Sequence, residues 1–140
     1  MEQVVIDTNV VIKLFLKEEY SDFALKLKDS YLAGKTDIVV NSLMKYEFIN
    51  VLKYKKFSSA EIKLALRAMA DYNFQIEELS DPIADLTSDL AVEYNLSSYD
   101  ASYVALASFL GYNLYTADIK LINKVSNLNF IKHIKEFHEK

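Results

Sequence analysis

Residues 4–9, Val4-Val5-Ile6-Asp7-Thr8-Asn9, decide the fold that this 140-residue chain is expected to adopt. The first three are β-branched and show no polar alternation, which is typical of a strand that is covered on both faces. The next three are residue types that cap helices, so a helix is expected to follow the strand directly. A doubly covered strand followed by a helix indicates the parallel sheet of an α/β protein.

The rest of the chain alternates short apolar strands with helices. Further strands are predicted at residues 38–40, 74–76, 113–116 and 130–131, and helices at 10–16, 22–33, 41–55, 58–71, 81–94, 99–110 and 119–125. Ser21 or Asp22 is the expected cap of the second helix, Asp81 that of the fifth, and Ser58 forms a capping box with Glu61. Right-handed crossovers place helices on both faces and bring the carboxyl ends of the strands to one edge. We predict an α/β fold, although the order of the strands is not readable from the sequence.

Length and composition narrow the class of protein. Residues 1–140 are treated as a single domain, because one core seldom splits below about 250 residues and no linker or repeat is visible. The absence of Cys excludes a disulfide scaffold, a thiol nucleophile and a thiolate zinc site. A net charge of −4 argues against nucleic-acid binding through bulk positive charge, but not against local lysine patches.

No targeting or membrane segment is expected. The N-terminus lacks the basic start of a signal peptide, and the uncharged run 101–117 is short and interrupted at Gly111. These features predict a cytoplasmic protein without a membrane span.

Two acids follow predicted strands. Asp7 comes directly after the first strand, and Asp118 follows Leu114-Tyr115-Thr116-Ala117. The carboxyl edge of a parallel sheet is where such proteins place their sites. Each Asp is also in position to cap the next helix, so either one taken alone is equally well explained as a cap.

Glu47 stands out on its helix. At about 100° per residue it falls inside the apolar arc, between Leu43 and Val51. Buried carboxylates are rare unless they are paired or bind a cation. The alternative is a Glu at the edge of the arc, extended to solvent or paired with Lys45 or Lys53.

Asp100 is the only charged residue between Tyr99 and Leu110, on a helix that is apolar or small nearly all round. The helix dipole explains an acid near the first turn. It does not explain why the acid points toward Tyr103, so a functional role is the favoured interpretation.

Converging carboxylates need a counter-charge, because their mutual repulsion otherwise keeps them protonated. No Arg or His precedes position 67, which leaves lysines or a divalent cation. Mg²⁺ and Mn²⁺ take oxygen ligands and keep waters, and such an ion supports the hydrolysis of a phosphodiester. His133 and His138 are expected at the surface or at a strand end, not as ligands or bases.

The ordered set of Val5-Ile6-Asp7-Thr8-Asn9, Tyr46-Glu47, Tyr99-Asp100-Ala101 and Leu114-Tyr115-Thr116-Ala117-Asp118 resembles the four acidic motifs of the PIN domain. Length and motif order are similar to those of a single-domain VapC-type toxin, and the resemblance covers nearly the whole chain. It implies a PIN-like, three-layer α/β/α fold with a short, mainly parallel sheet flanked by helices.

The resemblance also implies an activity, a Mg²⁺- or Mn²⁺-dependent endoribonuclease. Asp7, Glu47 and Asp100 would hold the metal ion, and Asp118 would complete the site through a second metal or a water. Thr8 and Thr116 match hydroxyl positions that orient carboxylates or water in such domains.

The implied partners are an RNA substrate, a second copy in a homodimer, and a cognate antitoxin whose tail lies over the active-site groove. Arg67 is the only Arg, a departure that leaves no obvious phosphate clamp. The candidates for an RNA path are lysines, which are by default ordinary surface residues: Lys13, Lys17, Lys53, Lys55, Lys56 and Lys120.

Three alternatives stay open. A receiver-like signalling domain also binds Mg²⁺ on an α/β fold, but it needs paired acids after the first strand, and Asp7 stands alone. A catalytically idle binding module would use the same fold for a partner. An RNA-processing nuclease without an antitoxin would share the four acids.

Overall fold

The computed structural model describes residues 1–139, and its centre is a five-stranded sheet in which every neighbouring pair is parallel. The strand order is β3-β2-β1-β4-β5. The strands are β1 (Glu2–Ile6), β2 (Thr36–Asn41), β3 (Gln75–Glu77), β4 (Asn113–Thr116) and β5 (Ile131–His133).

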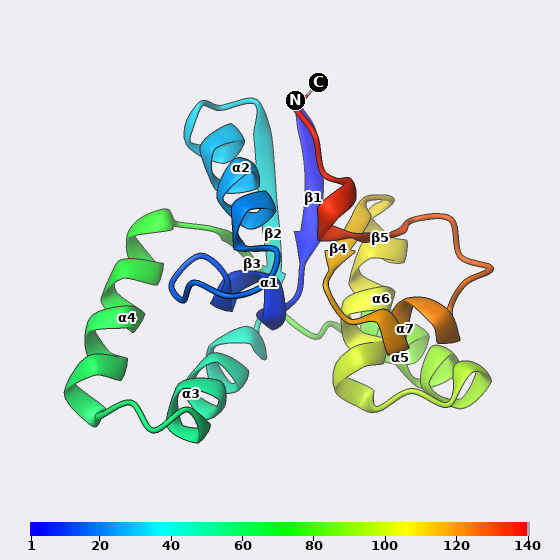
Figure 1. Ribbon diagram of the computed structural model, residues 1–140. Coiled ribbons are helices and arrows are strands. Elements are labelled where there is room, and N and C mark those ends of the chain that lie inside the picture. Colours follow the sequence, from blue (N-terminus) through cyan, green and yellow to red (C-terminus); the bar gives the residue numbers. More distant parts are fainter. Residues whose placement is uncertain (140) are drawn as a thin grey trace.

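Helices cover both faces of this sheet (Figure 1). One face carries α1 (Thr8–Ile12), α2 (Ser21–Leu32), α3 (Met44–Tyr54) and α4 (Ser59–Tyr72). The other carries α5 (Asp81–Tyr94), α6 (Ser98–Leu110) and α7 (Ile119–Lys124), and a short 3-10 helix, η1 (Ile134–Glu136), follows β5. The predicted three-layer α/β/α fold is confirmed.

The core has two halves because successive side chains of a strand point to opposite faces. Val4 and Ile6 of β1 pack with α1 to α4, whereas Val5 packs with α5 to α7. All three are fully buried. The apolar run without alternation was therefore a correct signal of a doubly covered strand.

The strand order places a topological switch point between β1 and β4. From β1 the chain continues outward to β2 and β3, and it then returns to the other side of β1 to form β4 and β5. In open α/β sheets a crevice forms at the carboxyl ends of the two strands on either side of such a reversal. A receiver-type sheet has its third strand in the centre, whereas β3 lies at the edge here, so the receiver alternative is excluded.

Most element boundaries agree with the predicted ones within a few residues, and the capping box of Ser58 and Glu61 is present. The helix after β1 differs, because it begins at Thr8 and ends at Ile12 instead of spanning 10–16. Ser80, and not Asp81, occupies the N-cap position of the fifth helix, and its side chain makes no capping hydrogen bond.

The cap of α2 was also predicted wrongly. Tyr20, in the left-handed conformation with φ of 67°, occupies the N-cap position. The Ser21 hydroxyl instead closes the preceding loop, because it donates to the Leu16 carbonyl and accepts from the Glu18 N–H. Within residues 1–139, no helix has both the length and the apolar character needed to cross a membrane.

Candidate active site

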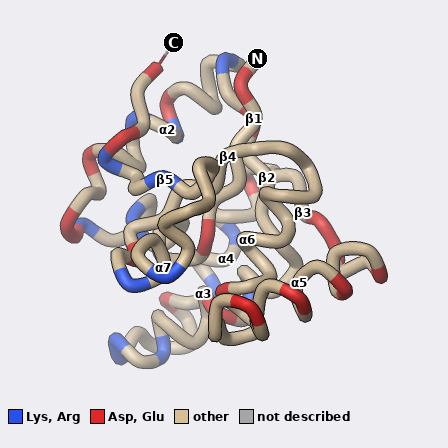
Figure 2. The backbone as a smooth tube through the Cα atoms, turned by 90° about the vertical axis from the view of Figure 1, so that its right-hand side faces the viewer, with Lys and Arg blue, Asp and Glu red and all other residues tan. Residues whose placement is uncertain are grey.

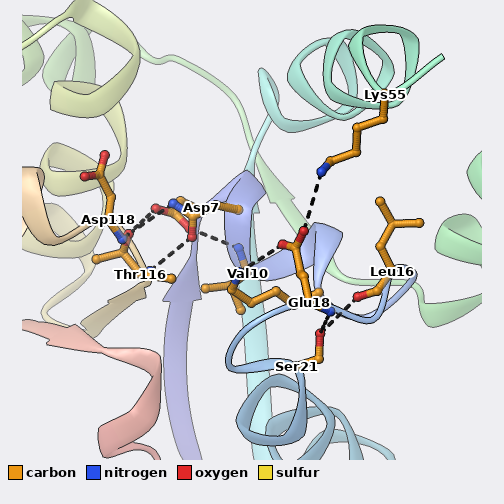
Figure 3. A network of polar contacts seen from close by, with 11 residues as sticks. Asp7, Val10, Leu16, Glu18, Ser21, Lys55, Thr116 and Asp118 are labelled. Carbon is orange, nitrogen blue, oxygen red and sulfur yellow. Dashed lines mark hydrogen bonds and ion pairs between the residues drawn. The ribbon is translucent and has the colours of Figure 1, made fainter.

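Asp7 lies at the carboxyl end of β1, directly beside the switch point. It is buried, and its Oδ1 accepts from the Val10 N–H at 3.3 Å, so it does cap α1. Its Oδ2 accepts from the Thr116 hydroxyl at 2.5 Å (Figure 3). Burial raises the pKa of Asp7 to about 7, although the hydrogen bond from Thr116 opposes that rise. A simple helix cap does not need to be buried at this electrostatic cost.

Thr116 and Asp118 belong to the end of the neighbouring strand β4. The Thr116 hydroxyl, fully buried, also accepts from the Asp118 N–H at 3.0 Å. Asp118 is half-buried and caps α7 through the Leu121 N–H. Asn9 joins the two strand ends, since its side-chain amide contacts Thr116 and its Oδ1 accepts from the Ala117 N–H. Both predicted strand-end acids are thus caps and members of one polar cluster.

Glu47 projects from α3 toward the same edge of the sheet and is half-buried. Its Oε1 lies 2.9 Å from the Thr8 hydroxyl and 2.6 Å from the Tyr103 hydroxyl. Among residues 1–139, neither Lys45 nor Lys53 forms an ion pair with it. The alternative of a lysine-paired surface Glu is therefore wrong.

Asp100 reaches the cluster from the first turn of α6. Its N–H donates to Ser97, the helix cap, while its side chain is half-buried. Burial raises the pKa of Asp100, and the charges of Asp118 and Glu47 raise it further, while Lys124 opposes the rise.

The four acids act on one another electrostatically. Asp118 and Asp100 both raise the pKa of Asp7, as Asp118 and Glu47 raise that of Asp100. Among the described residues, none of the four forms an ion pair with a Lys, Arg or His. The sequence-predicted set is therefore brought together, with its negative charge unneutralised by contact with protein cations.

A cavity of about 340 Å³ opens over most of this set. Its lining includes Asp7, Thr8, Glu47, Asp100 and Tyr103. The cavity therefore spans groups from β1, α1, α3 and α6 at the carboxyl edge of the sheet.

Glu18 is a fourth acid on the cavity wall, since Asp118 does not belong to the lining, and Glu18 is paired. It lies 2.9 Å from the Nζ of Lys13, which is buried, and 3.7 Å from the Nζ of Lys55, which is exposed (Figure 3). Lys55 also lines the cavity. Of the six lysines expected on an RNA path, only Lys55 both lines the cavity and is exposed.

Other cations lie nearby on α7, on which Figure 2 shows basic residues, whereas acidic residues recur along α5. The charge of Lys124, on α7, acts to lower the pKa of Asp100, and the Lys124 Nζ donates to the Asn95 carbonyl. Lys120 is exposed on the same helix, as Lys17, Lys53 and Lys56 are elsewhere.

The fit of the site to a divalent metal follows from its donor chemistry. The side-chain oxygens are carboxylates and hydroxyls, the ligands that Mg²⁺ and Mn²⁺ prefer. Within residues 1–139, no group of three or more Asp, Glu or His side chains has the geometry to hold an ion without help. A hydrated Mg²⁺ needs only one or two carboxylates because it keeps several waters. The donor set of the cluster fits such an ion, whose waters the remaining acids would contact.

Tyr103 and Glu18 also belong to the site, although no sequence pattern marks them as functional groups. Tyr103 is one of ten tyrosines and lies on a helix that is apolar or small nearly all round, so its sequence pattern indicates an ordinary core residue. Glu18 lies in a loop among surface charges. The histidines stay outside the site, and His133 ends β5 as expected.

Comparisons with known proteins identify the family and the fold of the chain. The model of the PIN domain family matches residues 4–127. No curated protein matches the sequence. Solved structures with the same fold include PAE2754 from Pyrobaculum aerophilum, at 23% identity and a TM-score of 0.71, with 96% of this chain and 85% of that chain covered.

Two further structures come from toxin systems. A toxin–antitoxin complex from Klebsiella pneumoniae has 22% identity and a TM-score of 0.71, with 96% of this chain and 99% of that chain covered. VapC20 of Mycobacterium tuberculosis, described as a sarcin–ricin loop cleaving toxin, has 15% identity and a TM-score of 0.70, with coverages of 92% and 97%.

Proposed function

The chain belongs to the PIN domain family, and we propose that it is a metal-dependent endoribonuclease that acts as the toxin of a toxin–antitoxin pair. The observation that carries the proposal is the gathering of Asp7, Glu47, Asp100 and Asp118 at the switch point of the sheet, with no ion pair to a protein cation within residues 1–139. Such a cluster is expected to bind a cation, because unpaired carboxylates in a partly buried place repel one another.

A bound Mg²⁺ or Mn²⁺ would supply a Lewis acid and a water of lowered pKa next to the phosphodiester. Asp7, Glu47 and Asp100 would hold the ion, one or two of them directly and the rest through its waters, and Asp118 would complete the site through a water or a second ion. Thr116 orients Asp7, and Thr8 orients Glu47, through the hydrogen bonds that they make. These residues therefore fix the carboxylates before metal and substrate arrive.

RNA is the proposed substrate. VapC20, described as cleaving the sarcin–ricin loop, has the same fold over 92% of this chain, which supports RNA rather than DNA. Lys55, at the cavity, is the best-placed cation for a phosphate of that RNA. An RNA substrate would place the activity in the cytoplasm.

The proposed partners are a cognate antitoxin and a second copy of the chain. The Klebsiella pneumoniae complex, in which a toxin of this fold is bound by an antitoxin, supports the first. A homodimer is expected from the family resemblance. Light scattering on the purified chain gives its mass directly, and a mass of about 16 kDa instead of twice that value would contradict the dimer.

Mn²⁺ binding by calorimetry tests the site before any RNA is chosen. We expect saturable binding by the wild-type protein and at least tenfold weaker binding by Asp100→Asn. Asp89→Asn, which changes an exposed acid on α5, is the matched control and should bind like wild type. No wild-type binding at millimolar Mn²⁺, without RNA or with it, would contradict the metal mechanism.

Cleavage of total cellular RNA tests the reaction class. Products should appear with Mn²⁺ or Mg²⁺, and they should disappear with excess chelator and with Asp100→Asn. Cleavage that persists in chelator would contradict the mechanism. An RNA-processing nuclease without an antitoxin is distinguished by expression in cells, because a toxin arrests growth unless its antitoxin is co-expressed.

A further inference from the structure

Tyr103 brings an uncharged hydroxyl into the acid cavity. Its ring is buried, with only 3% of the residue exposed, and its hydroxyl lies 2.6 Å from Glu47 Oε1 and 2.7 Å from the Thr8 hydroxyl. Thr8 in turn lies 2.9 Å from the same Glu47 oxygen. Three oxygens from α1, α3 and α6 thus form a closed triangle.

The triangle holds only two hydroxyl protons. Tyr103 donates to Glu47 Oε1, and the Thr8 proton goes either to the same oxygen or to the Tyr103 oxygen. A phenol is protonated at neutral pH, so Tyr103 remains a donor to Glu47. In both arrangements Glu47 Oε1 accepts at least one hydrogen bond.

The contact also joins the two outer layers of the fold. Glu47 belongs to α3 on one face of the sheet, and Tyr103 belongs to α6 on the other (Figure 1). Asp100 lies on the same helix one turn before Tyr103. The hydrogen bond at the carboxyl edge therefore sets the position of Glu47 relative to Asp100.

We propose that Tyr103 is a positioning residue that, with Thr8, holds Glu47 Oε1 inside the protein and leaves Oε2 as the oxygen that faces the cation. This inference rests on the proposed metal-dependent function and adds a residue to it. Hydrogen bonds of this kind orient a carboxylate ligand, and their loss typically weakens metal binding by roughly 10- to 100-fold.

Tyr103→Phe tests the proposal, because it removes the hydroxyl and keeps the ring. We expect Mn²⁺ binding by calorimetry to weaken by roughly tenfold, at the low end of that range because Thr8 remains. Tyr115→Phe is the matched control, since Tyr115 is also buried but is absent from the cavity lining. It should bind Mn²⁺ within about twofold of wild type. Equal affinities for the two variants would overturn the proposal.

A double-mutant cycle in urea, without metal, tests the contact by itself. Tyr103→Phe and Glu47→Ala are measured singly and together, and contacting residues should give a combined shift in midpoint smaller than the sum of the single shifts. Additive shifts would overturn the proposed contact. Wild-type protein that fails to bind Mn²⁺ would contradict the proposed function instead, and the cycle would still report on Tyr103 and Glu47.

Discussion

The Thr116 hydroxyl donates a 2.5 Å hydrogen bond to Oδ2 of Asp7, from the end of β4 to the end of β1. The two residues are 109 positions apart in the sequence, and they face each other across the switch point because β1 and β4 are neighbours in the sheet. This bond is the main hydrogen bond that opposes the rise in the pKa of Asp7. It therefore determines how readily Asp7 is ionised near neutral pH.

Thr116→Val is expected to weaken metal binding most at low pH. The loss of the donor should move the pKa of Asp7 further above its value of about 7, so that less of the carboxylate is ionised at pH 7. We expect Mn²⁺ affinity to fall roughly tenfold at pH 7 and to recover partly at pH 9. Calorimetry at several pH values measures the shift.

Thr36→Val is the control for that substitution, since Thr36 is also a buried Thr but bonds to Ser30 at the far end of β2. It should leave the pH dependence of Mn²⁺ binding unchanged. Identical pH midpoints for Thr116→Val and wild type would contradict the assigned role of the hydroxyl.

Asp7→Asn should stabilise the metal-free protein at high pH. The pKa of Asp7 is about 7 in the folded chain and near 3.8 when unfolded, so between these values the folded state binds more protons. The contribution of Asp7 to the free energy of unfolding is therefore greatest below about pH 4, and it is lost as the pH rises to 7. The neutral Asn avoids that loss. We therefore expect the free energy of unfolding of Asp7→Asn to exceed that of wild type by roughly 2–4 kcal/mol at pH 8 and to differ little from it at pH 4.

Urea unfolding in chelator at both pH values measures this effect. The same substitution should abolish the additional stability that Mn²⁺ gives the wild-type protein at pH 8. A variant that is less stable than wild type at pH 8 would show that Asp7 is held as a simple helix cap.

Local patterns predicted the parts of this fold that local interactions decide. The run of Val4 to Ile6 predicted a doubly covered strand, and the Ser58–Glu61 pattern predicted a capping box, because each depends on residues close in sequence. The strand order depends on contacts between distant segments and had no such signal. The switch point that makes Asp7 and Thr116 neighbours was therefore known only from the structure.

The residues of the site differ in the same way, because some are marked by a local sequence pattern and others only by contacts between distant segments. Glu47 was detectable because a charge interrupts an apolar arc. Tyr103 was not, because a buried tyrosine on an apolar helix has the same pattern whether its hydroxyl meets a carboxylate or only packs. Glu18 gave no signal either, since its partners Lys13 and Lys55 are 5 and 37 positions away in the sequence.

Lys55→Met is expected to weaken RNA binding and leave metal binding intact. Lys55 lines the cavity, and its 3.7 Å contact with Glu18 is partly exposed, so it contributes little to stability. We expect several-fold weaker binding of a labelled single-stranded RNA in chelator. The slope of log affinity against log salt concentration should fall by about the value of one phosphate contact. Fluorescence anisotropy at several salt concentrations measures both quantities.

Lys63→Met, which removes an exposed lysine from α4, is the matched control and should change RNA affinity less than Lys55→Met does. If the two variants lose the same amount of RNA affinity, Lys55 contributes only through the net charge of the protein, and its position at the cavity has no specific role.

Glu18→Gln should destabilise the fold through Lys13. The Lys13 side chain is only 9% exposed, and its ammonium lies 2.9 Å from Glu18 Oε1. A Gln of the same size keeps one acceptor but removes the charge, so the ammonium becomes a buried cation without an ionic partner. We expect the free energy of unfolding, measured in urea, to fall by roughly 1–3 kcal/mol.

Glu19→Gln changes the exposed neighbour and should lower the free energy of unfolding by less than about 0.5 kcal/mol. Equal losses for the two variants would mean that Lys13 reaches solvent, in which case it is as available to a phosphate as Lys55.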